Sequence, residues 1–398
     1  MEQIVELRHD TNQFETATSL KAKDQLDTVI AKWRKTIQRD PQDSQAYVTL
    51  ADALRARGQM DAAVNQLHEA LRAKPQDPEI YMALGNCLSD NKQMEEAASA
   101  YRNAIRFRPD DATAHNNLGL VLHTMKRHTE AAIEWREALR IDAGYAYAHN
   151  NLGAALYHLG HVDAAVAEWQ KAIEIDPRLG ATRYNLANVL YKSGRHDEAI
   201  GYYNEILVND PQDARTRTSL GIAYQEQGNL DAAMAQWQIA IKANPKLAEP
   251  RQHLGAALYM KGLVDNAIAE LREAIRLDPR DAWANFNLGV IMSNEGQLEA
   301  AVERFEDAVH ASPTMSNAHF NLANALYKTG NLQGAIREWR QTVSLKTDHA
   351  WAHFNLGIAL RKGGQLVAAQ QAMAEAVKID PKIAGRTFLN LDTVNDLR

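Results

Sequence analysis

The chain has 398 residues, of which 45% are hydrophobic and 24% charged, so it carries enough apolar material to form a folded core. The formal net charge is −6, and Lys and Arg are interspersed with Asp and Glu, which argues against a nucleic-acid partner. A single cysteine excludes an internal disulfide and a cysteine-based zinc site. No stretch resembles a signal peptide or a membrane-spanning helix. We therefore expect a cytoplasmic protein without membrane insertion.

Prolines recur on a 34-residue register, which indicates an internal repeat. They are Pro41, Pro75, Pro109, Pro177, Pro211, Pro245, Pro279, Pro313 and Pro381. Counted from Ser44 as position 1 of repeat 1, the register gives ten repeats up to Ile383 without insertion or deletion. Position 7 is Leu and position 20 is Ala in all ten repeats, and position 8 is always Gly or Ala. Such fixed spacing predicts tandem structural units.

Each repeat is predicted to form a helical hairpin. Apolar residues at positions 4, 7, 8 and 11 make one helical stripe, and those at positions 17, 20, 21, 24, 27 and 28 make a second. A Gly or a short polar cluster near position 15 separates the two stripes. No repeat can bury its apolar face alone, so neighbours must stack. We expect an all-α solenoid with three regions: an N-terminal cap with a degenerate repeat (1–43), ten tandem repeats (44–383) and a C-terminal capping helix (384–398).

The order Leu-Gly, Ala, aromatic, Pro within each repeat resembles the tetratricopeptide repeat pattern over most of the chain. This resemblance implies a right-handed superhelix whose first helices line a concave face and whose second helices line a convex face. The family's usual aromatic at position 4 is kept only as Tyr47 and Tyr81. Elsewhere this position holds His, Arg or Asn, which loosens the match at one position without changing the predicted fold.

Position 6 holds asparagine in six of the ten repeats. The six are Asn117, Asn151, Asn185, Asn287, Asn321 and Asn355. Asn is a mediocre helix residue, so helix propensity does not explain the pattern. In the family's geometry position 6 faces the groove, where a carboxamide can bond both the C=O and the N–H of an extended peptide. The repeats resemble those of O-linked N-acetylglucosamine transferases, in which a comparable ladder holds peptide backbones, but we expect no catalytic domain in this chain.

Large aromatic side chains accompany these asparagines at positions 2 and 5. They are Tyr184, Trp283, Phe286, Phe320, Trp351 and Phe354. Aromatics in rows that face solvent are typical of binding surfaces. We predict that the asparagines and these aromatics together bind a peptide. Two alternatives stay open: the asparagines bond locally or are merely tolerated, and the aromatics pack between repeats.

Histidines at position 4 invite a metal hypothesis. They are His115, His149, His319 and His353. Helices of adjacent repeats lie roughly 8–10 Å apart, whereas imidazole ligands must converge to about 2.0–2.1 Å from one zinc ion, so this row cannot chelate. We interpret these residues as half-buried replacements of the family aromatic and expect no metal. Arg183, Arg217 and Arg251 hold the same position, where their stems pack and their heads reach water, with an acidic-ligand site as the alternative.

The sequence carries no nucleotide-binding loop, no nucleophile-and-base motif and no zinc-hydrolase motif. We therefore expect no cofactor and no catalysis. Cys87 is interpreted as a small packing residue. The predicted function is a protein-interaction scaffold that binds an extended segment of a partner protein along its groove. The alternative is a structural protein that uses exposed aromatics to assemble with copies of itself, so homo-oligomers remain open.

Overall fold

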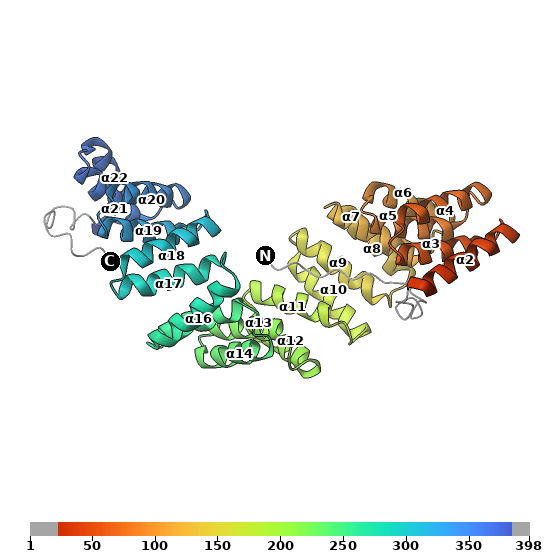
Figure 1. The fold of residues 1–398 in the computed structure, drawn as a ribbon, viewed down its shortest axis with the longest axis horizontal. Coiled ribbons are helices and arrows are strands. Elements are labelled where there is room, and N and C mark those ends of the chain that lie inside the picture. Colours follow the sequence, from red (N-terminus) through yellow and green to blue (C-terminus); the bar gives the residue numbers. More distant parts are fainter. Residues whose placement is uncertain (1–22, 384–398) are drawn as a thin grey trace. The chain divides into compact units, whose positions relative to one another are not determined.

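The computed structural model describes residues 23–383, and all regular structure in this range is helical. In chain order the elements are α2 (Lys23–Arg39), α3 (Ser44–Ala56), α4 (Met60–Ala73), α5 (Pro78–Asp90), α6 (Met94–Phe107), α7 (Ala112–Thr124), α8 (His128–Ile141), α9 (Ala146–His158), α10 (Val162–Ile175), α11 (Gly180–Lys192), α12 (His196–Asn209), α13 (Ala214–Glu226), α14 (Leu230–Ala243), α15 (Glu249–Met260), α16 (Val264–Leu277), α17 (Ala282–Asn294), α18 (Leu298–Ala311), α19 (Ser316–Lys328), α20 (Leu332–Leu345), α21 (Ala350–Lys362), α22 (Leu366–Ile379) and the short 3-10 helix η1 (Pro381–Ile383) (Figure 1).

The chain divides into two compact parts, Met1–Ile206 and Leu207–Arg398, with the boundary inside α12. They are called the N-terminal part and the C-terminal part below. The boundary falls within the range 44–383 that the sequence predicts as one array. In the predicted N-terminal cap, α2 lies where the sequence keeps the pattern of a second helix. The predicted capping helix at 384–398 lies outside the described residues.

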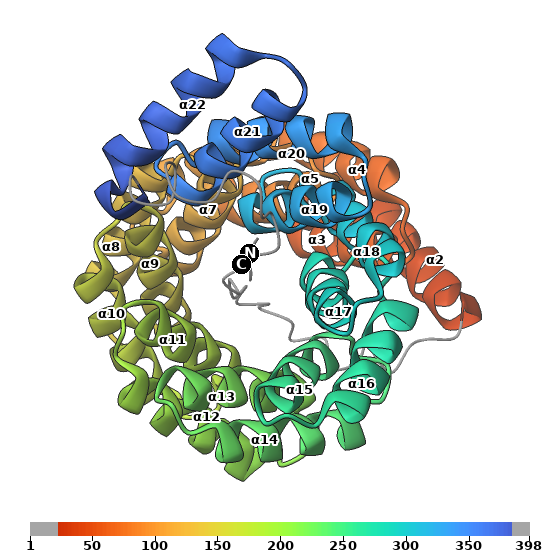
Figure 2. The ribbon, with the colours of Figure 1, turned by 90° about the vertical axis from the view of Figure 1, so that its left-hand side faces the viewer.

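Each repeat is a pair of helices, and the pairs stack. In repeat 3, α7 packs against α8, and α8 packs in turn against α9 of repeat 4. First helices of successive repeats also touch, as α7 and α9 do in the N-terminal part and α17 and α19 do in the C-terminal part. Within each part the first helices lie on the inner side of the curve and the second helices on the outer side (Figure 2). The predicted all-α solenoid of helical hairpins is confirmed.

Helix starts follow from an aspartate at the last position of several repeats. The aspartates that cap the following first helix are Asp43, Asp77, Asp111, Asp213 and Asp281. The carboxylate of Asp111, for example, accepts hydrogen bonds from the backbone N–H groups of Thr113 and Ala114, each at 3.0 Å. Such a cap satisfies N–H groups that the first helical turn leaves without a partner. In these five places the aspartate fixes where the first helix of a repeat begins.

Between the two helices of a repeat the chain reverses at position 15, where φ is positive in every repeat. Gly occupies this position in eight repeats, as at Gly160 with φ 82°, while Lys92 and Lys126 occupy it in repeats 2 and 3 with φ 61° and 63°. A positive φ places Cβ against the backbone in every residue except Gly, which explains the preference. The glycine that the sequence places near position 15 therefore marks a left-handed turn residue.

The core of a repeat forms where the side chain at position 24 enters the space beside position 8. Trp135, Trp169 and Trp237 occupy position 24 and are fully buried. A Cβ added to Gly119 or Gly153 would lie 2.7 Å from the indole nitrogen of the tryptophan in its own repeat, closer than real Cβ contacts. The indole N–H groups of the three tryptophans donate to the backbone carbonyl at position 5, at 3.1, 3.0 and 3.2 Å. Glycine at position 8 thus makes room for the ring.

Repeat 9 shows what happens when position 8 has a side chain. Here position 8 is Ala323, and the indole N–H of Trp339 donates to Oδ1 of Asn324 at 3.2 Å instead of to a backbone carbonyl. Trp339 is still fully buried. Among the four tryptophans at position 24, the three with Gly at position 8 donate to a backbone carbonyl. The one with Ala at position 8 donates to a side-chain oxygen.

We expect the substitution Gly153→Ala to destabilise the protein by roughly 1–3 kcal/mol, because the added methyl group overlaps a fully buried ring. Urea unfolding followed by circular dichroism measures the change. The matched control is Gly201→Ala in α12, where no heavy atom lies within 4 Å of an added Cβ. That variant should gain about 0.5–1 kcal/mol from helix propensity. Equal stability of the two variants would contradict the proposed ring contact.

Candidate functional site

The six asparagines at position 6 fall into two groups. Asn151, Asn185 and Asn355 are buried, with exposed fractions of 0%, 1% and 2%. The remaining three, Asn117, Asn287 and Asn321, are partly exposed. This corrects the expected geometry, because half of the predicted ladder lies inside the wall of the solenoid. A peptide-binding role for the exposed members stays a prediction.

In the N-terminal part, side-chain amides form a hydrogen-bonded series that crosses four repeats. We call it the asparagine chain, and its members are Asn86, Asn117, Asn116, Asn151, Asn150 and Thr182. The Asn117 amide donates to Asn86 at 3.3 Å, and the Asn151 amide donates to Asn116 at 3.2 Å. Each of these two bonds joins the first helices of successive repeats. The asparagine chain therefore ties α5, α7, α9 and α11 together.

Neighbouring asparagines at positions 5 and 6 complete the series. Within repeat 4, the Asn150 amide donates to the Asn151 oxygen at 3.0 Å, while the Thr182 hydroxyl donates to the Asn150 oxygen at 2.9 Å. Asn116, Asn150 and Asn151 are each 0% exposed. Because buried amides need partners, the repeated pair Asn-Asn is explained by mutual satisfaction rather than by an external ligand.

A second contact of this kind occurs in the C-terminal part. The amide of Asn355 donates to Oδ1 of Asn324 at 3.1 Å, the same oxygen that accepts the indole N–H of Trp339. By contrast, the repeat before Asn321 offers Phe286 and Val290 at positions 5 and 9, and the Asn321 amide donates to the carbonyl of Asn317 in its own helix at 2.9 Å. In these cases the preceding repeat decides whether a position-6 asparagine joins the wall.

Position 4 carries a polar contact that holds the two helices of a repeat together. His115, His149 and His319 bond through Nδ1 to a glutamate at position 23 of the same repeat, at 2.7, 2.6 and 2.7 Å. Their Nε2 atoms lie 3.3, 3.3 and 3.1 Å from the backbone carbonyl six residues earlier. Both ring nitrogens are engaged, so these histidines serve the fold. The interpretation that they replace the family aromatic agrees with this placement.

Arginine at position 4 uses the same partner position in repeats 6 and 7, whereas Arg183 in repeat 5 pairs with Glu205 at position 26. Arg251 pairs with Glu270 at 2.7 Å, and Arg217 donates to Gln236 at 2.8 Å. In repeat 8 the polarity reverses, and Arg304 at position 23 donates to Asn285 at position 4, at 3.1 Å. The sequence analysis missed this pairing. A partial signal was present, because position 23 is Glu in repeats 3, 4, 7 and 9, where position 4 is His or Arg, although repeat 10 combines His353 with Ala372.

These contacts shift histidine pKa values in a direction that reports their environment. Burial opposes protonation of His115, but the hydrogen bond and charge of Glu134 and the Pro109 carbonyl raise its pKa above the usual value. The hydrogen bond of Glu338 raises the pKa of His319 in the same way. His253, which stacks on Trp237 with ring centroids 5.3 Å apart, has the opposite shift, because burial lowers its pKa to about 4.

The predicted aromatic residues do not share one environment. Tyr184 is buried, and its ring centroid lies 6.1 Å from that of Tyr203, so it belongs to the core of repeat 5. Trp283 is 54% exposed on α17 and meets Phe286 edge to face, with ring centroids 5.8 Å apart at 89°. This corrects the expectation that Tyr184 faces an open groove.

The aromatic pair of repeat 8 recurs in repeat 10. Trp351 and Phe354 on α21 have the same centroid distance of 5.8 Å and the same angle of 89°. Between them, Phe320 on α19 lies 4.6 Å from the ring of His349. We call Trp283, Phe286, Phe320, Trp351 and Phe354 the aromatic face. All five are at least partly exposed and stand at positions 2 and 5 of three consecutive repeats in the C-terminal part.

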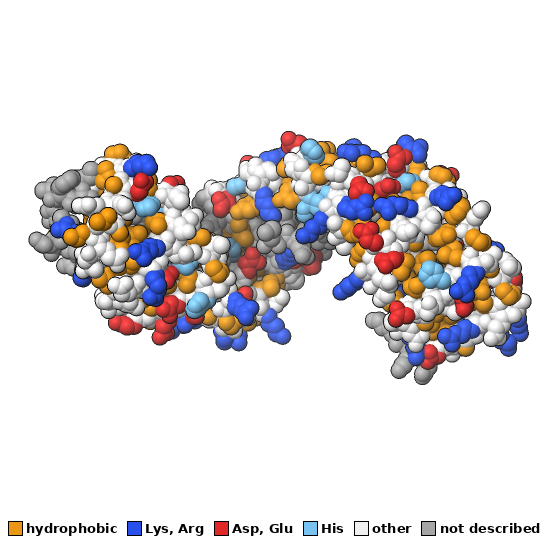
Figure 3. Space-filling model, turned by 90° about the horizontal axis from the view of Figure 1, so that it is seen from above, with side chains coloured by type: hydrophobic (Ala, Val, Ile, Leu, Met, Phe, Trp, Pro, Cys, Tyr) orange, Lys and Arg blue, Asp and Glu red, His pale blue; other side chains and the backbone are white. Residues whose placement is uncertain are grey.

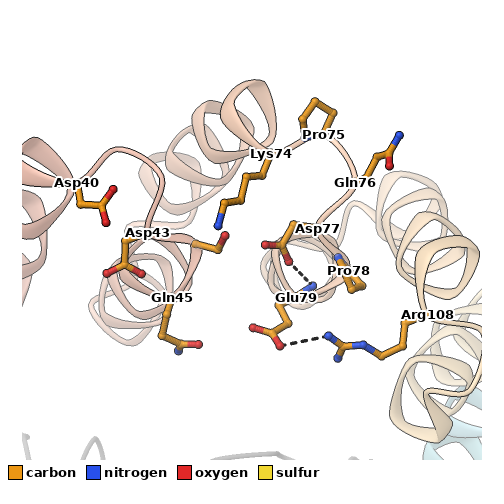
Figure 4. A pocket seen from close by; sticks show the side chains of 11 residues that line it. Asp40, Asp43, Gln45, Lys74, Pro75, Gln76, Asp77, Pro78, Glu79 and Arg108 are labelled. Carbon is orange, nitrogen blue, oxygen red and sulfur yellow. Dashed lines mark hydrogen bonds and ion pairs between the residues drawn. The ribbon is translucent and has the colours of Figure 1, made fainter.

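Charged side chains are distributed differently from the aromatics. On the surface seen in Figure 3, acidic and basic side chains intermingle without forming a field of one sign. A hollow of 880 Å³ in the N-terminal part is lined by the turns before α3 and α5 and by Arg108 (Figure 4). Its carboxylates hold the fold: Asp43 and Asp77 cap helices, and Glu79 bonds to Arg108 at 3.2 Å. The acidic side chains that line this hollow thus serve to cap helices and to form an ion pair, which explains their presence without a ligand.

The described residues offer no other obvious chemical centre. Between residues 23 and 383, no group of three or more His, Cys, Asp and Glu side chains is arranged to hold a metal ion. In the same range no helix is both long and apolar enough to cross a membrane. Cys87 is buried, and burial raises the pKa of its thiol to about 12, so the thiolate nucleophile is suppressed.

Comparison with protein families places the chain. A tetratricopeptide repeat model matches residues 21–78, 48–112, 93–146, 150–214 and 218–282. Further models of this repeat match 270–303, 294–343 and 323–364. The chain belongs to the tetratricopeptide repeat family. Solenoids of this kind present extended surfaces for other proteins, so the chain is a protein-interaction scaffold. A search of the curated proteins gives no match.

Several solved structures resemble the chain. YrrB, described as "a TPR protein with an unusual peptide-binding site", is 24% identical and covers 47% of this chain and 96% of its own, with a TM-score of 0.42. PilF of Pseudomonas aeruginosa is 23% identical and covers 52% and 95%, with a TM-score of 0.46. A chain of the APC/C hetero-tetramer Cut9-Hcn1 is 14% identical and covers 94% and 95%, also with a TM-score of 0.46.

We expect Asn151→Ala to destabilise the protein by about 1–3 kcal/mol, because the buried amides of Asn116 and Asn150 each lose one hydrogen-bond partner. Chemical unfolding with and without the substitution measures this cost. Asn321→Ala is the matched control, since it removes a partly exposed carboxamide at the same position of the repeat, and its effect should stay within about 0.5 kcal/mol. If both variants unfolded alike, the asparagine chain would have no structural role.

The histidine contacts predict a pH dependence of stability. The raised pKa values of His115 and His319 mean that their contribution is fully present below the unfolded value of about 6.5 and is lost as the pH rises through the folded values. The double variant His115→Gln, His319→Gln should therefore lose most stability relative to the parent near pH 5.5–6 and least near about pH 9. Unfolding free energies across this range measure the difference.

His253 provides a control, because its pKa is shifted in the opposite direction and its effect on stability should have the opposite pH dependence. Its lowered pKa means that its contribution is present above about 6.5 and is lost as the pH falls toward about 4. His253→Gln should therefore differ most from the parent at neutral pH. A double variant whose deficit grew with rising pH would contradict the assignment of His115 and His319 as protonated partners.

Proposed function

We propose that this chain is a non-catalytic cytoplasmic scaffold that binds an extended segment of a partner protein, and that the aromatic face of repeats 8–10 is the binding site. The observation that carries the proposal is the recurrence of one edge-to-face aromatic pair in repeats 8 and 10, with Trp283 54% exposed. Exposed aromatic side chains supply large contact area at low conformational cost, which is why they dominate binding hot spots.

The neighbouring asparagines support the proposal. Asn287 and Asn321 stand at position 6 beside the aromatic face and are partly exposed. Each carboxamide offers an oxygen acceptor and at least one N–H donor to a peptide backbone, although Asn321 already uses one N–H on the Asn317 carbonyl. Asn355 is instead 2% exposed and bonded to Asn324. The binding set is therefore reduced from the six predicted asparagines to these two plus the five aromatics.

Part of the aromatic face is supported by the hydrophobic core beneath it. Val290 and Met292 pack with Phe286 and Phe320 against the core of repeats 8–10. Phe286 and Phe320 are thereby held in place before a ligand arrives, and preorganised contacts lose less entropy on binding. Hydrogen bonds to the two asparagines contribute only about 0.5–1.5 kcal/mol each, so the aromatic contacts must supply most of the affinity.

Peptides selected from a random display library on the wild-type protein test this proposal. The double variant Trp283→Ala, Trp351→Ala should bind the selected peptides at least about tenfold more weakly by fluorescence anisotropy, because two anchors are removed. Its melting should be nearly unchanged. Leu345→Ala on the second helix α20 is the matched control, since this side chain is 36% exposed outside the aromatic face.

Two outcomes would overturn the proposal. Selected peptides that bind the double variant as tightly as the parent would place the binding site elsewhere. A concentration-dependent dimer in sedimentation that the double variant abolishes, together with a failure to select any peptide, would assign the aromatic face to self-assembly.

A further inference from the structure

The aromatic face repeats with a fixed step. Its three stations are the pair Trp283 and Phe286, the single Phe320, and the pair Trp351 and Phe354, one station on each of α17, α19 and α21. The first helices α17 and α19 touch directly. Because helices in contact lie roughly 8–10 Å apart, we expect a step of this size from one station to the next.

This step discriminates between ligand conformations. A polyproline II segment has three residues per turn and rises about 3.1 Å per residue, so residues i, i+3 and i+6 lie on one side at intervals of about 9.3 Å. A β-strand advances about 10 Å over three residues, but alternate side chains point to opposite faces, so residue i+3 points away. Along an α-helix one turn advances about 5.4 Å and two turns about 10.8 Å, so neither repeat falls within the range of roughly 8–10 Å. Only the polyproline II period brings an anchor to every station.

The chemistry of the stations fits the same ligand. At the outer stations, two rings meet edge to face at 89°, which presents an aromatic plane beside a ring edge. At the middle station, Phe320 lies 4.6 Å from His349, whose pKa is lowered by burial, so that ring pair is uncharged. Aromatic-lined grooves are the usual receptors for proline-rich segments, whose stiffness reduces the entropy lost on binding.

Polar groups beside the aromatic face match a ligand that lacks N–H groups. Proline residues offer backbone carbonyls but no backbone donors. The carboxamides of Asn287 and Asn321 can supply donors to those carbonyls. The last turns of α19 and α21 carry Lys328, Arg361 and Lys362, which favours an acidic residue at one side of the ligand.

We propose that the aromatic face binds a proline-rich segment of a partner protein in the polyproline II conformation, with proline or apolar anchors at i, i+3 and i+6. This inference rests on the proposed function, which it narrows to one ligand class. Trp283, Phe320 and Trp351 each receive one anchor. The ligand runs across α17, α19 and α21.

Three fluorescein-labelled synthetic peptides of about ten residues test the conformation. The first places proline anchors at every third residue with a glutamate at one end. The second has the same composition with the anchors at every second residue. The third alternates valine and threonine, which favours a β-strand. The first peptide should bind the full chain at least about tenfold more tightly than the other two.

A mutant cycle tests the register. Removing the last anchor triplet from the first peptide should weaken binding to the parent severalfold but leave binding to Trp351→Ala, Phe354→Ala unchanged, because the third station is already gone. Leu345→Ala should behave like the parent. An equal loss in the parent and in the double variant would overturn the proposed register.

The outcomes separate this inference from the proposed function. If the valine-threonine peptide bound best and Trp283→Ala, Trp351→Ala weakened it, the face would bind peptides in β conformation, and the polyproline inference would fail alone. If no peptide bound above background and display selection gave none, both proposals would fail. Binding of the first peptide that ignores both tryptophan substitutions would also overturn the inference.

Discussion

Much of the structure depends on one contact within each repeat, the insertion of the position-24 side chain beside position 8. Seven repeats have Gly at position 8, and in each a Cβ there would lie within 3 Å of the side chain at position 24. In these seven repeats the position-24 side chain therefore fills the space that a methyl group at position 8 would need. Since a single hairpin leaves its other faces uncovered, this packing gains its full value when repeats stack.

In the N-terminal part, the asparagine chain and the position-4 contacts link helices of the solenoid to one another. The asparagine chain crosses repeats 2 to 5, and the position-4 contacts join the two helices within a repeat. Buried amides are costly unless each finds a partner, so such a series also opposes slipped packing between repeats, in which the amides would lose their partners. The repeated phrase AHNNLG is therefore a unit of assembly: its asparagines join repeats, and its glycine admits the tryptophan.

The repeat register was enough to predict the helical hairpins and the break between their helices near position 15, because these depend on residues within one repeat. The asparagines at position 6 required more. Asn151 and Asn321 occupy the same register, yet Asn151 meets Asn116 of the preceding repeat while Asn321 follows a repeat with Phe286 and Val290. A single-position pattern cannot distinguish the two, whereas a comparison across successive repeats could have done so. The same comparison would have found the pairs between positions 4 and 23.

Position 5 explains why the two parts use the same scaffold differently. In repeats 3 and 4 it is Asn116 and Asn150, whose amides satisfy position 6 and close the surface. In repeats 8, 9 and 10 it is phenylalanine, which offers no hydrogen bond and leaves position 6 without that partner. Where position 5 is Asn, its buried amide bonds to the neighbouring asparagine. Where position 5 is Phe, the ring is partly exposed and forms part of the aromatic face. The helix pairs beneath still pack through a buried side chain at position 24, as Phe305 and Trp339 show in repeats 8 and 9, so this change of residue needs no change in the fold.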